Sequence, residues 1–149
     1  MLYFDTLTKL IGIPYRYPGS DFDGCDCWGI VKLYYKTILN QDIPNVSLLF
    51  TKEKIETFKP LMTDLCKFPP FDCFQNTPRD KIAVSDILVF DRGPFGAHCA
   101  VYLGRDTMLH IYEPVGANGD IEIGSHIVSA SSGGHWKKKI VVCWRLKSI

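Results

Sequence analysis

A cysteine at the start of a predicted helix is the residue best suited to chemistry. Cys27 follows a loop rich in glycine and proline, residues 12–25, and apolar residues recur after it with helical spacing. A thiol in this position lies among unpaired backbone N–H groups at the positive end of the helix dipole, and both favour the nucleophilic thiolate. Asp26 is predicted to cap the helix. Two alternatives remain: Cys27 is a small buried apolar side chain, or Cys25, just before the helix, is the nucleophile.

Two histidines could supply the base that a cysteine nucleophile needs and the group that orients this base. His98 stands where a glycine-containing loop enters a predicted strand, and His110 lies between apolar residues of the next strand. The order of cysteine, histidine and a polar partner recurs in papain-like enzymes. Taken singly, His98 is equally consistent with an exposed strand-edge histidine, and His110 with a hydrogen-bonded core histidine.

The turn between these strands decides whether the two histidines can meet. Facing residues of a hairpin share one side of the sheet. A hairpin centred on Gly104 places His98 opposite His110, and one centred on Arg105 makes them diagonal neighbours. A two-residue turn at residues 105–106 alone would put them on opposite faces. We therefore predict a loop of odd length or a β-bulge here.

The remaining pattern predicts the elements that position these residues. Helical spacing covers residues 2–11 and 26–40, and a weaker helix over 51–66 is interrupted at Pro60. Apolar strands follow at 87–90, 99–103, 108–112, 121–123 and 140–144. Helices followed by strands indicate an α+β fold with a mainly antiparallel sheet, formed by one domain over residues 1–149. His126 and His135, in or beside the loop at 129–135, are predicted to be surface residues.

An irregular aromatic segment, residues 67–80, separates the two halves of the chain. It contains three prolines and three phenylalanines. Its simplest role is to cover the core, and a substrate-groove wall or a docking surface remains the alternative.

Composition narrows the functional classes. Seventeen basic residues balance sixteen acidic ones, for a net charge of +1, which gives no reason to expect a nucleic-acid or anionic-membrane partner. We see neither an export signal nor a stretch long enough to span a membrane, so we expect synthesis and folding in a cytosol. The six cysteines are then thiols by default. The single residue between Cys25 and Cys27 is too short a spacing for a common zinc site, so no metal or cofactor is predicted.

Several segments together resemble the NlpC/P60 family of cysteine peptidases. The resemblance rests on the set Gly12-Ile13-Pro14-Tyr15, Asp26-Cys27-Trp28-Gly29-Ile30-Val31, Ser85-Asp86-Ile87-Leu88-Val89-Phe90, His98-Cys99-Ala100-Val101-Tyr102-Leu103-Gly104 and Leu109-His110. It implies a papain-like α+β domain with the cysteine helix packed on the sheet. It also implies hydrolysis of an amide bond in peptidoglycan stem peptides, often between D-glutamate and the diamino acid.

The resemblance assigns roles to individual residues. Cys27 would be the nucleophile, His98 the general base and acid, and His110 the third, orienting residue. Tyr15 matches a family tyrosine near the nucleophile, and we place Tyr15, Asp26 and Trp28 on the substrate-binding side of the site. Two positions depart from the usual pattern. Trp28 replaces a common serine, and Ser85 replaces a common glycine.

The sequence around the cysteine is similar to a variant of this family found in tailed-phage tail tips and gene-transfer agents. The similar features are Asp-Cys-Trp-Gly-Ile-Val, a following Leu-Tyr-Tyr-x-x-x-Leu helix and Ile43-Pro44. This implies a virion tail tip as the location and neighbouring tail-tip or baseplate proteins as partners. Two rival functions stay open: a structural tail-tip component with little or no activity, and a thiol acyltransferase or amidase acting on small substrates.

Overall fold

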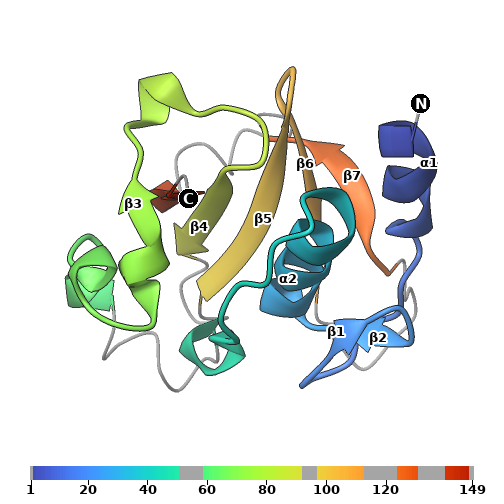
Figure 1. Cartoon of the computed structure of the whole chain (residues 1–149), viewed down its shortest axis with the longest axis horizontal. Coiled ribbons are helices and arrows are strands. Elements are labelled where there is room, and N and C mark those ends of the chain that lie inside the picture. The colour runs from blue at the N-terminus through green and yellow to red at the C-terminus, as the bar shows by residue number, and fades with distance from the viewer. Residues whose placement is uncertain (1, 51–58, 92–96, 113–123, 131–139, 148–149) are drawn as a thin grey trace.

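A six-stranded antiparallel sheet carries the fold in the computed structural model, which describes residues 2–50, 59–91, 97–112, 124–130 and 140–147. The sheet order is β3-β8-β4-β5-β6-β7, and every ladder in it is antiparallel. Its strands are β3 Phe74–Asn76, β4 Ile87–Asp91, β5 Ala97–Gly104, β6 Thr107–His110, β7 His126–Ser129 and β8 Ile140–Leu146. Helix α2 lies in front of this sheet (Figure 1). The predicted α+β class with a mainly antiparallel sheet is confirmed.

Three smaller elements flank the cysteine loop. Helix α1 spans Leu2–Lys9, and a short ribbon of β1 Ser20–Asp21 and β2 Gly24–Cys25 precedes helix α2, Cys27–Ile38. The predicted helices 2–11 and 26–40 are thus present with slightly shorter bounds. Asn40, just past α2, adopts a left-handed φ of 53°, as expected for a residue that ends a helix.

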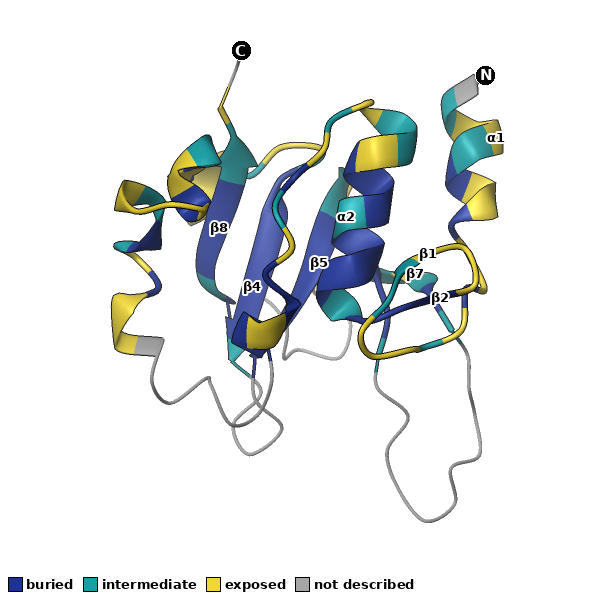
Figure 2. Ribbon diagram, turned by 60° about the horizontal axis from the view of Figure 1, so that its bottom comes forward, coloured by how far each residue is buried: buried dark blue, intermediate teal, exposed yellow. Residues whose placement is uncertain are grey.

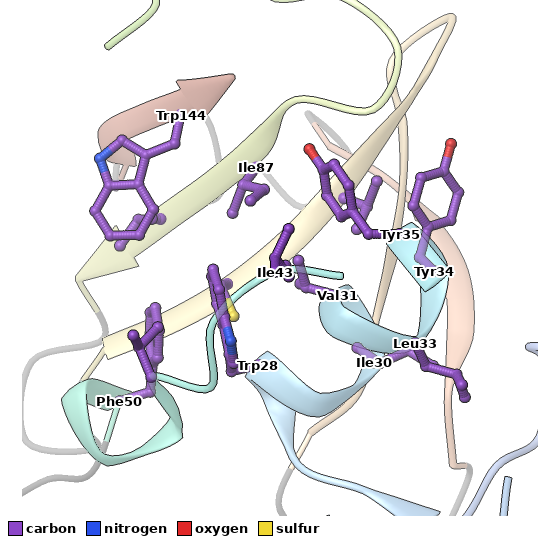
Figure 3. Packing of buried hydrophobic residues seen from close by; sticks show 14 of the residues in the cluster. Trp28, Ile30, Val31, Leu33, Tyr34, Tyr35, Ile43, Phe50, Ile87 and Trp144 are labelled. Atoms are coloured by element: carbon purple, nitrogen blue, oxygen red, sulfur yellow. The ribbon is translucent and has the colours of Figure 1, made fainter. Parts of the chain in front are cut away.

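The apolar face of α2 packs onto the sheet and forms the main core. Figure 2 shows this face buried beside β5 while the opposite side of the helix is partly exposed. Trp28 stacks on Phe50 with ring centroids 5.5 Å apart and meets Phe74 and Trp144 edge-on (Figure 3). A second, smaller cluster around Leu88, Phe90 and Met108 covers the other face of the sheet. The core therefore fixes the helix against β5 and β6, and Trp28 extends the contact to Trp144 of β8.

The turn between β5 and β6 has the predicted irregularity. Arg105 and Asp106 form a two-residue turn with positive φ values of 51° and 61°, and the register shifts by a bulge between Tyr102 and Gly104. Beyond the bulge Val101 faces Leu109, which makes His98 and His110 diagonal neighbours on one face. The prediction of an odd loop or a bulge is confirmed.

Other expectations need correction. The predicted 51–66 helix, expected to be interrupted at Pro60, is in its described part a pair of short 3-10 turns at Lys59–Leu61 and Leu65–Lys67 rather than an α-helix. The segment 67–80 contributes strand β3, and its Phe71 and Phe74 are buried in the core. This favours the covering role for the segment.

Some of the predicted elements and residues lie outside the part of the chain that the structure describes. Residues 51–58, the predicted strand at 121–123 and His135 lie outside it. No helix in the described ranges combines the length and apolar character that crossing a bilayer would require.

Candidate active site

Cys27 is the first residue of α2, and the capped helix start holds it in place. The Asp26 carboxylate accepts hydrogen bonds from the Gly29 N–H at 2.6 Å, the Ser47 hydroxyl at 3.0 Å and the Gly19 N–H at 3.4 Å. Asp26 is 2% exposed, whereas Cys27 is only partly buried. The predicted cap is confirmed, and a buried carboxylate fixes the turn that presents the thiol.

The position two residues after Cys27 has room only for glycine, and Gly29 occupies it. A Cβ atom there would collide with the carbonyl oxygen of Gly19. The first turn of α2 therefore packs directly against the backbone of the cysteine loop, and only a glycine permits this approach.

A hydrogen bond joins the helix start to the strand that carries His98. The Cys99 thiol donates to the carbonyl oxygen of Cys27 at 3.1 Å. Cys99 follows His98 directly in β5, so the first residues of α2 and β5 are held together. In Figure 1 both elements begin toward the lower edge of the view.

The two predicted histidines meet on the sheet. His98 Nε2 and His110 Nδ1 are 2.9 Å apart, and both side chains are buried, at 2% and 0% exposure. Tyr112 stacks on the His98 ring with a centroid distance of 5.1 Å and an interplanar angle of 16°. Burial, a direct hydrogen bond and a stacked ring together restrict His98 to one orientation.

A third histidine, which the sequence placed on the surface, extends this pair. His126 lies in β7 directly opposite His110, and the Nε2 atoms of the two rings are 3.1 Å apart. His126 is only partly exposed. The prediction of a surface position therefore missed the contact that His126 makes with His110. No local pattern marked β7 as a strand, and only the β6–β7 register reveals the contact.

The remaining predicted site residues have different surroundings. The backbone of Tyr15 forms a bridge to Cys25, because Arg16 N–H donates to Cys25 and Cys25 N–H donates to Pro14, at 2.9 and 3.0 Å. Tyr15 thus lies opposite Cys25, which precedes Cys27 by two positions in the chain. Trp28 is completely buried, and its indole N–H donates to the Pro44 carbonyl at 2.9 Å. Trp28 therefore serves the core, and its burial leaves no surface for a substrate.

Cys25 has the environment of a structural thiol. It is completely buried, its thiol donates to the Asp21 carbonyl at 3.2 Å, and burial together with the nearby Asp26 raises its pKa to about 12. Burial also raises the pKa of Cys99 well above its ordinary value. Both thiols are accordingly protonated at neutral pH, which disfavours Cys25 as the nucleophile.

In the ranges that the structure describes, no group of three or more His, Cys, Asp or Glu side chains is arranged to hold a metal ion. The three histidines are instead joined ring to ring by hydrogen bonds.

Comparisons with known proteins agree with this architecture. Murein DD-endopeptidase MepS/Murein LD-carboxypeptidase of Escherichia coli K12 is 23% identical over 128 residues, which cover 86% of this chain and 53% of that protein. The chain thus spans about half the length of the curated relatives it matches.

Two solved structures share the fold. A lipoprotein-like NLP/P60 protein of Staphylococcus aureus Mu50 has a TM-score of 0.60 at 18% identity, covering 99% of this chain and 41% of that one. RipD of Mycobacterium tuberculosis, described as a non-catalytic NlpC/p60 protein adapted to peptidoglycan binding, has a TM-score of 0.55 at 13% identity, with 98% and 95% covered. The sequence profile of the NlpC/P60 family matches residues 12–145, so this chain belongs to the NlpC/P60 family.

Proposed function

We propose that the chain is a peptidoglycan endopeptidase that hydrolyses an amide bond of the stem peptide with Cys27, His98 and His110. The observation that carries the proposal is the arrangement of the helix start. Asp26 caps the turn that presents the Cys27 thiol, and Cys99 ties that turn to the strand residue next to His98. A scaffold protein needs neither a partly exposed thiol there nor a buried pair of hydrogen-bonded histidines.

The proposed reaction is acyl transfer in two halves. The Cys27 thiol passes its proton to His98, and the resulting thiolate attacks the amide carbonyl carbon and forms the S–C bond. His98 gives its proton to the leaving amine as the C–N bond breaks. His98 then takes a proton from water as the water oxygen attacks the thioester. The S–C bond breaks, which releases a carboxylate product and the thiolate.

The helix start also supplies a donor for the oxyanion. The Trp28 and Gly29 N–H groups bond the Asp26 side chain, and the Ile30 N–H bonds the Asp26 carbonyl. The Cys27 N–H is the remaining group of this first turn, and we assign it to the oxyanion of the tetrahedral intermediate.

The substrate assignment rests on the family and on the murein endopeptidase among the curated relatives. Within that class we propose the bond between D-glutamate and the diamino acid, which the resemblance of the cysteine segment implies.

The finer proposal is that the enzyme acts from a phage tail tip and contacts neighbouring tail-tip proteins. It is supported by the segment Asp26 to Val31, the helix that follows it and Ile43-Pro44, which are similar to the tail-tip variant. Mass spectrometry of purified particles from the strain that encodes the chain tests this location. The chain should be found in the particles, and its exclusive recovery outside them would contradict the proposal.

A peptidoglycan-binding protein without activity is the second candidate function. RipD favours it, because that protein shares the fold and is described as non-catalytic. The free thiol and the histidine pair of the present chain favour catalysis instead.

Digestion of purified peptidoglycan by the wild type and by Cys27→Ala separates these functions, with products read by mass spectrometry. New stem-peptide fragments that disappear in the variant would establish the hydrolase and identify the bond. Absence of fragments from a folded wild type whose Cys27 resists alkylation would support the binding function. A rapidly alkylated Cys27 without fragments would reject this substrate.

A further inference from the structure

The three histidines form a chain of hydrogen bonds whose direction is fixed at one end. His126 Nδ1 lies 2.9 Å from the carbonyl oxygen of Gly124, which can only accept. His126 therefore carries its proton on Nδ1 when neutral, and its Nε2 must accept from His110 Nε2 at 3.1 Å. His110 Nδ1 must then accept from His98 Nε2 at 2.9 Å. A neutral His98 is left with an unprotonated Nδ1, the form that a general base requires.

The carbonyl that sets this direction is itself firmly held. Ser125, the next residue, is completely buried, and its hydroxyl accepts from the Ile13 N–H and donates to the Leu10 carbonyl, at 2.9 and 2.5 Å. Its backbone bonds Gly12 and Ile13 at 2.7 and 2.9 Å. The loop that precedes the nucleophile thus anchors the far end of the histidine chain.

Gly124 fits this anchor tightly. It adopts a positive φ of 71°, and a Cβ atom there would lie 2.7 Å from the Ile13 carbonyl oxygen. A side chain would therefore displace the segment that carries the carbonyl.

We infer that His126 is a positioning residue that, through His110, keeps the proton of His98 on Nε2 and so leaves Nδ1 to receive the thiol proton. The catalytic consequence rests on the proposed function, whereas the tautomers do not. Without His126, the His110 ring loses this acceptor, and the constraint that it places on the His110 tautomer is removed; the opposite tautomer would point an N–H at His98 Nε2.

Ring tautomers measured by two-bond 15N–1H NMR at about pH 8, above the ordinary histidine pKa, test the inference directly. The wild type should show His126 protonated on Nδ1 and both His98 and His110 on Nε2. In His126→Ala the His110 signals should shift toward a mixture of tautomers. A wild type with His98 or His110 protonated on Nδ1 would overturn the inference, whether or not the protein cleaves peptidoglycan.

Kinetics on soluble peptidoglycan fragments supply the second readout. His126→Ala should lower kcat about tenfold with KM within about twofold, as for loss of one orienting hydrogen bond. His126→Gln should recover most of kcat, because its amide can accept from His110 and donate to Gly124. Ile127→Ala, in the same strand, is the control for packing. Equal kcat values for His126→Ala and the wild type, or equal losses in His126→Ala and Ile127→Ala, would overturn the inference. A wild type that cleaves nothing would instead reject the proposed function and leave the NMR measurement to decide.

Discussion

The three thiols around the start of α2 have sharply different environments. Cys27 is partly exposed at the helix start, whereas Cys25 and Cys99 are completely buried and burial raises the pKa of each. Iodoacetamide at pH 8 should therefore modify Cys27 well before the other two, as followed by peptide mapping. Earlier labelling of Cys25 would restore it as the candidate nucleophile.

The Asp26 carboxyl group gives a second prediction at this scale. Burial raises its pKa from an ordinary 3.8, against four hydrogen bonds that lower it. The folded chain therefore holds this proton to a higher pH than the unfolded chain. From about pH 4 up to the raised pKa, the folded state binds more protons, so the free energy of unfolding falls as pH rises.

Urea unfolding of the wild type and Asp26→Asn between pH 4 and 7 measures this effect. Asparagine retains the cap, so the stability of the wild type relative to the variant should fall with rising pH. Asp42→Asn is a control with the opposite sign, measured below about pH 4: Lys32 lowers the pKa of Asp42, so the contribution of this pair to stability should be lost as pH falls toward that lowered pKa. A wild-type advantage over Asp26→Asn that grows with pH would contradict the assignment.

At the scale of elements, the approach of α2 to the cysteine loop depends on Gly29. Helix propensity alone would make Gly29→Ala stabilising by about 1 kcal/mol. The new Cβ would collide with the Gly19 carbonyl, so we expect a net loss of about 1–3 kcal/mol, as for other overpacked sites. Urea denaturation measures it, with Lys36→Ala on the exposed side of α2 as the control. A Gly29→Ala variant at least as stable as the wild type would contradict this prediction and would show that the cysteine loop moves away from the new Cβ at little cost.

The elements also show which features the sequence could reveal. The cap at Asp26 and the bulge before Gly104 follow from local chemistry and from the need to bring His98 and His110 to one face, and both were predictable. Strand β7 and the role of His126 depend on a register with β6 that is distant in the chain. Trp28 looked available for substrate because its burial depends on Phe50, Phe74 and Trp144, which come from other parts of the fold.

The structure gives a physical reason for Ser85, which departs from the family pattern. Ser85, which replaces a usual glycine, adopts a positive φ of 77°. Its hydroxyl lies 2.8 Å from the Tyr34 hydroxyl, and its carbonyl accepts from the Tyr35 hydroxyl. Side chains of α2 therefore hold a backbone conformation that glycine would adopt without help.

Across the whole molecule, an ion pair joins the beginning of β4 to the end of β8. Asp86 is 2% exposed and accepts from Arg145 Nε and Nη2, both at 2.8 Å. Arg145→Met would leave this carboxylate buried and unpaired. We expect the free energy of unfolding to fall by about 2–3 kcal/mol. This is less than the loss usual for fully buried ion pairs, because Arg145 is partly exposed.

Thermal or urea unfolding checks this prediction against two further variants. Lys32→Met breaks an ion pair to the exposed Asp42 and should change stability little. Adding Asp86→Asn to Arg145→Met should recover part of the loss, because the uncompensated charge is removed. An Arg145→Met variant as stable as the wild type would contradict the prediction and would mean that water compensates the Asp86 charge.

The proposed hydrolysis depends on the Cys27 thiol, and comparing the loss of this thiol with the loss of Cys25 tests it most directly. Peptidoglycan is digested in parallel by the wild type, Cys27→Ala and Cys25→Ala, with equal folding checked by circular dichroism and soluble fragments quantified over time. The account predicts release by the wild type and Cys25→Ala and none by Cys27→Ala. Release by a folded Cys27→Ala at the wild-type rate would contradict the assignment of Cys27 as the nucleophile.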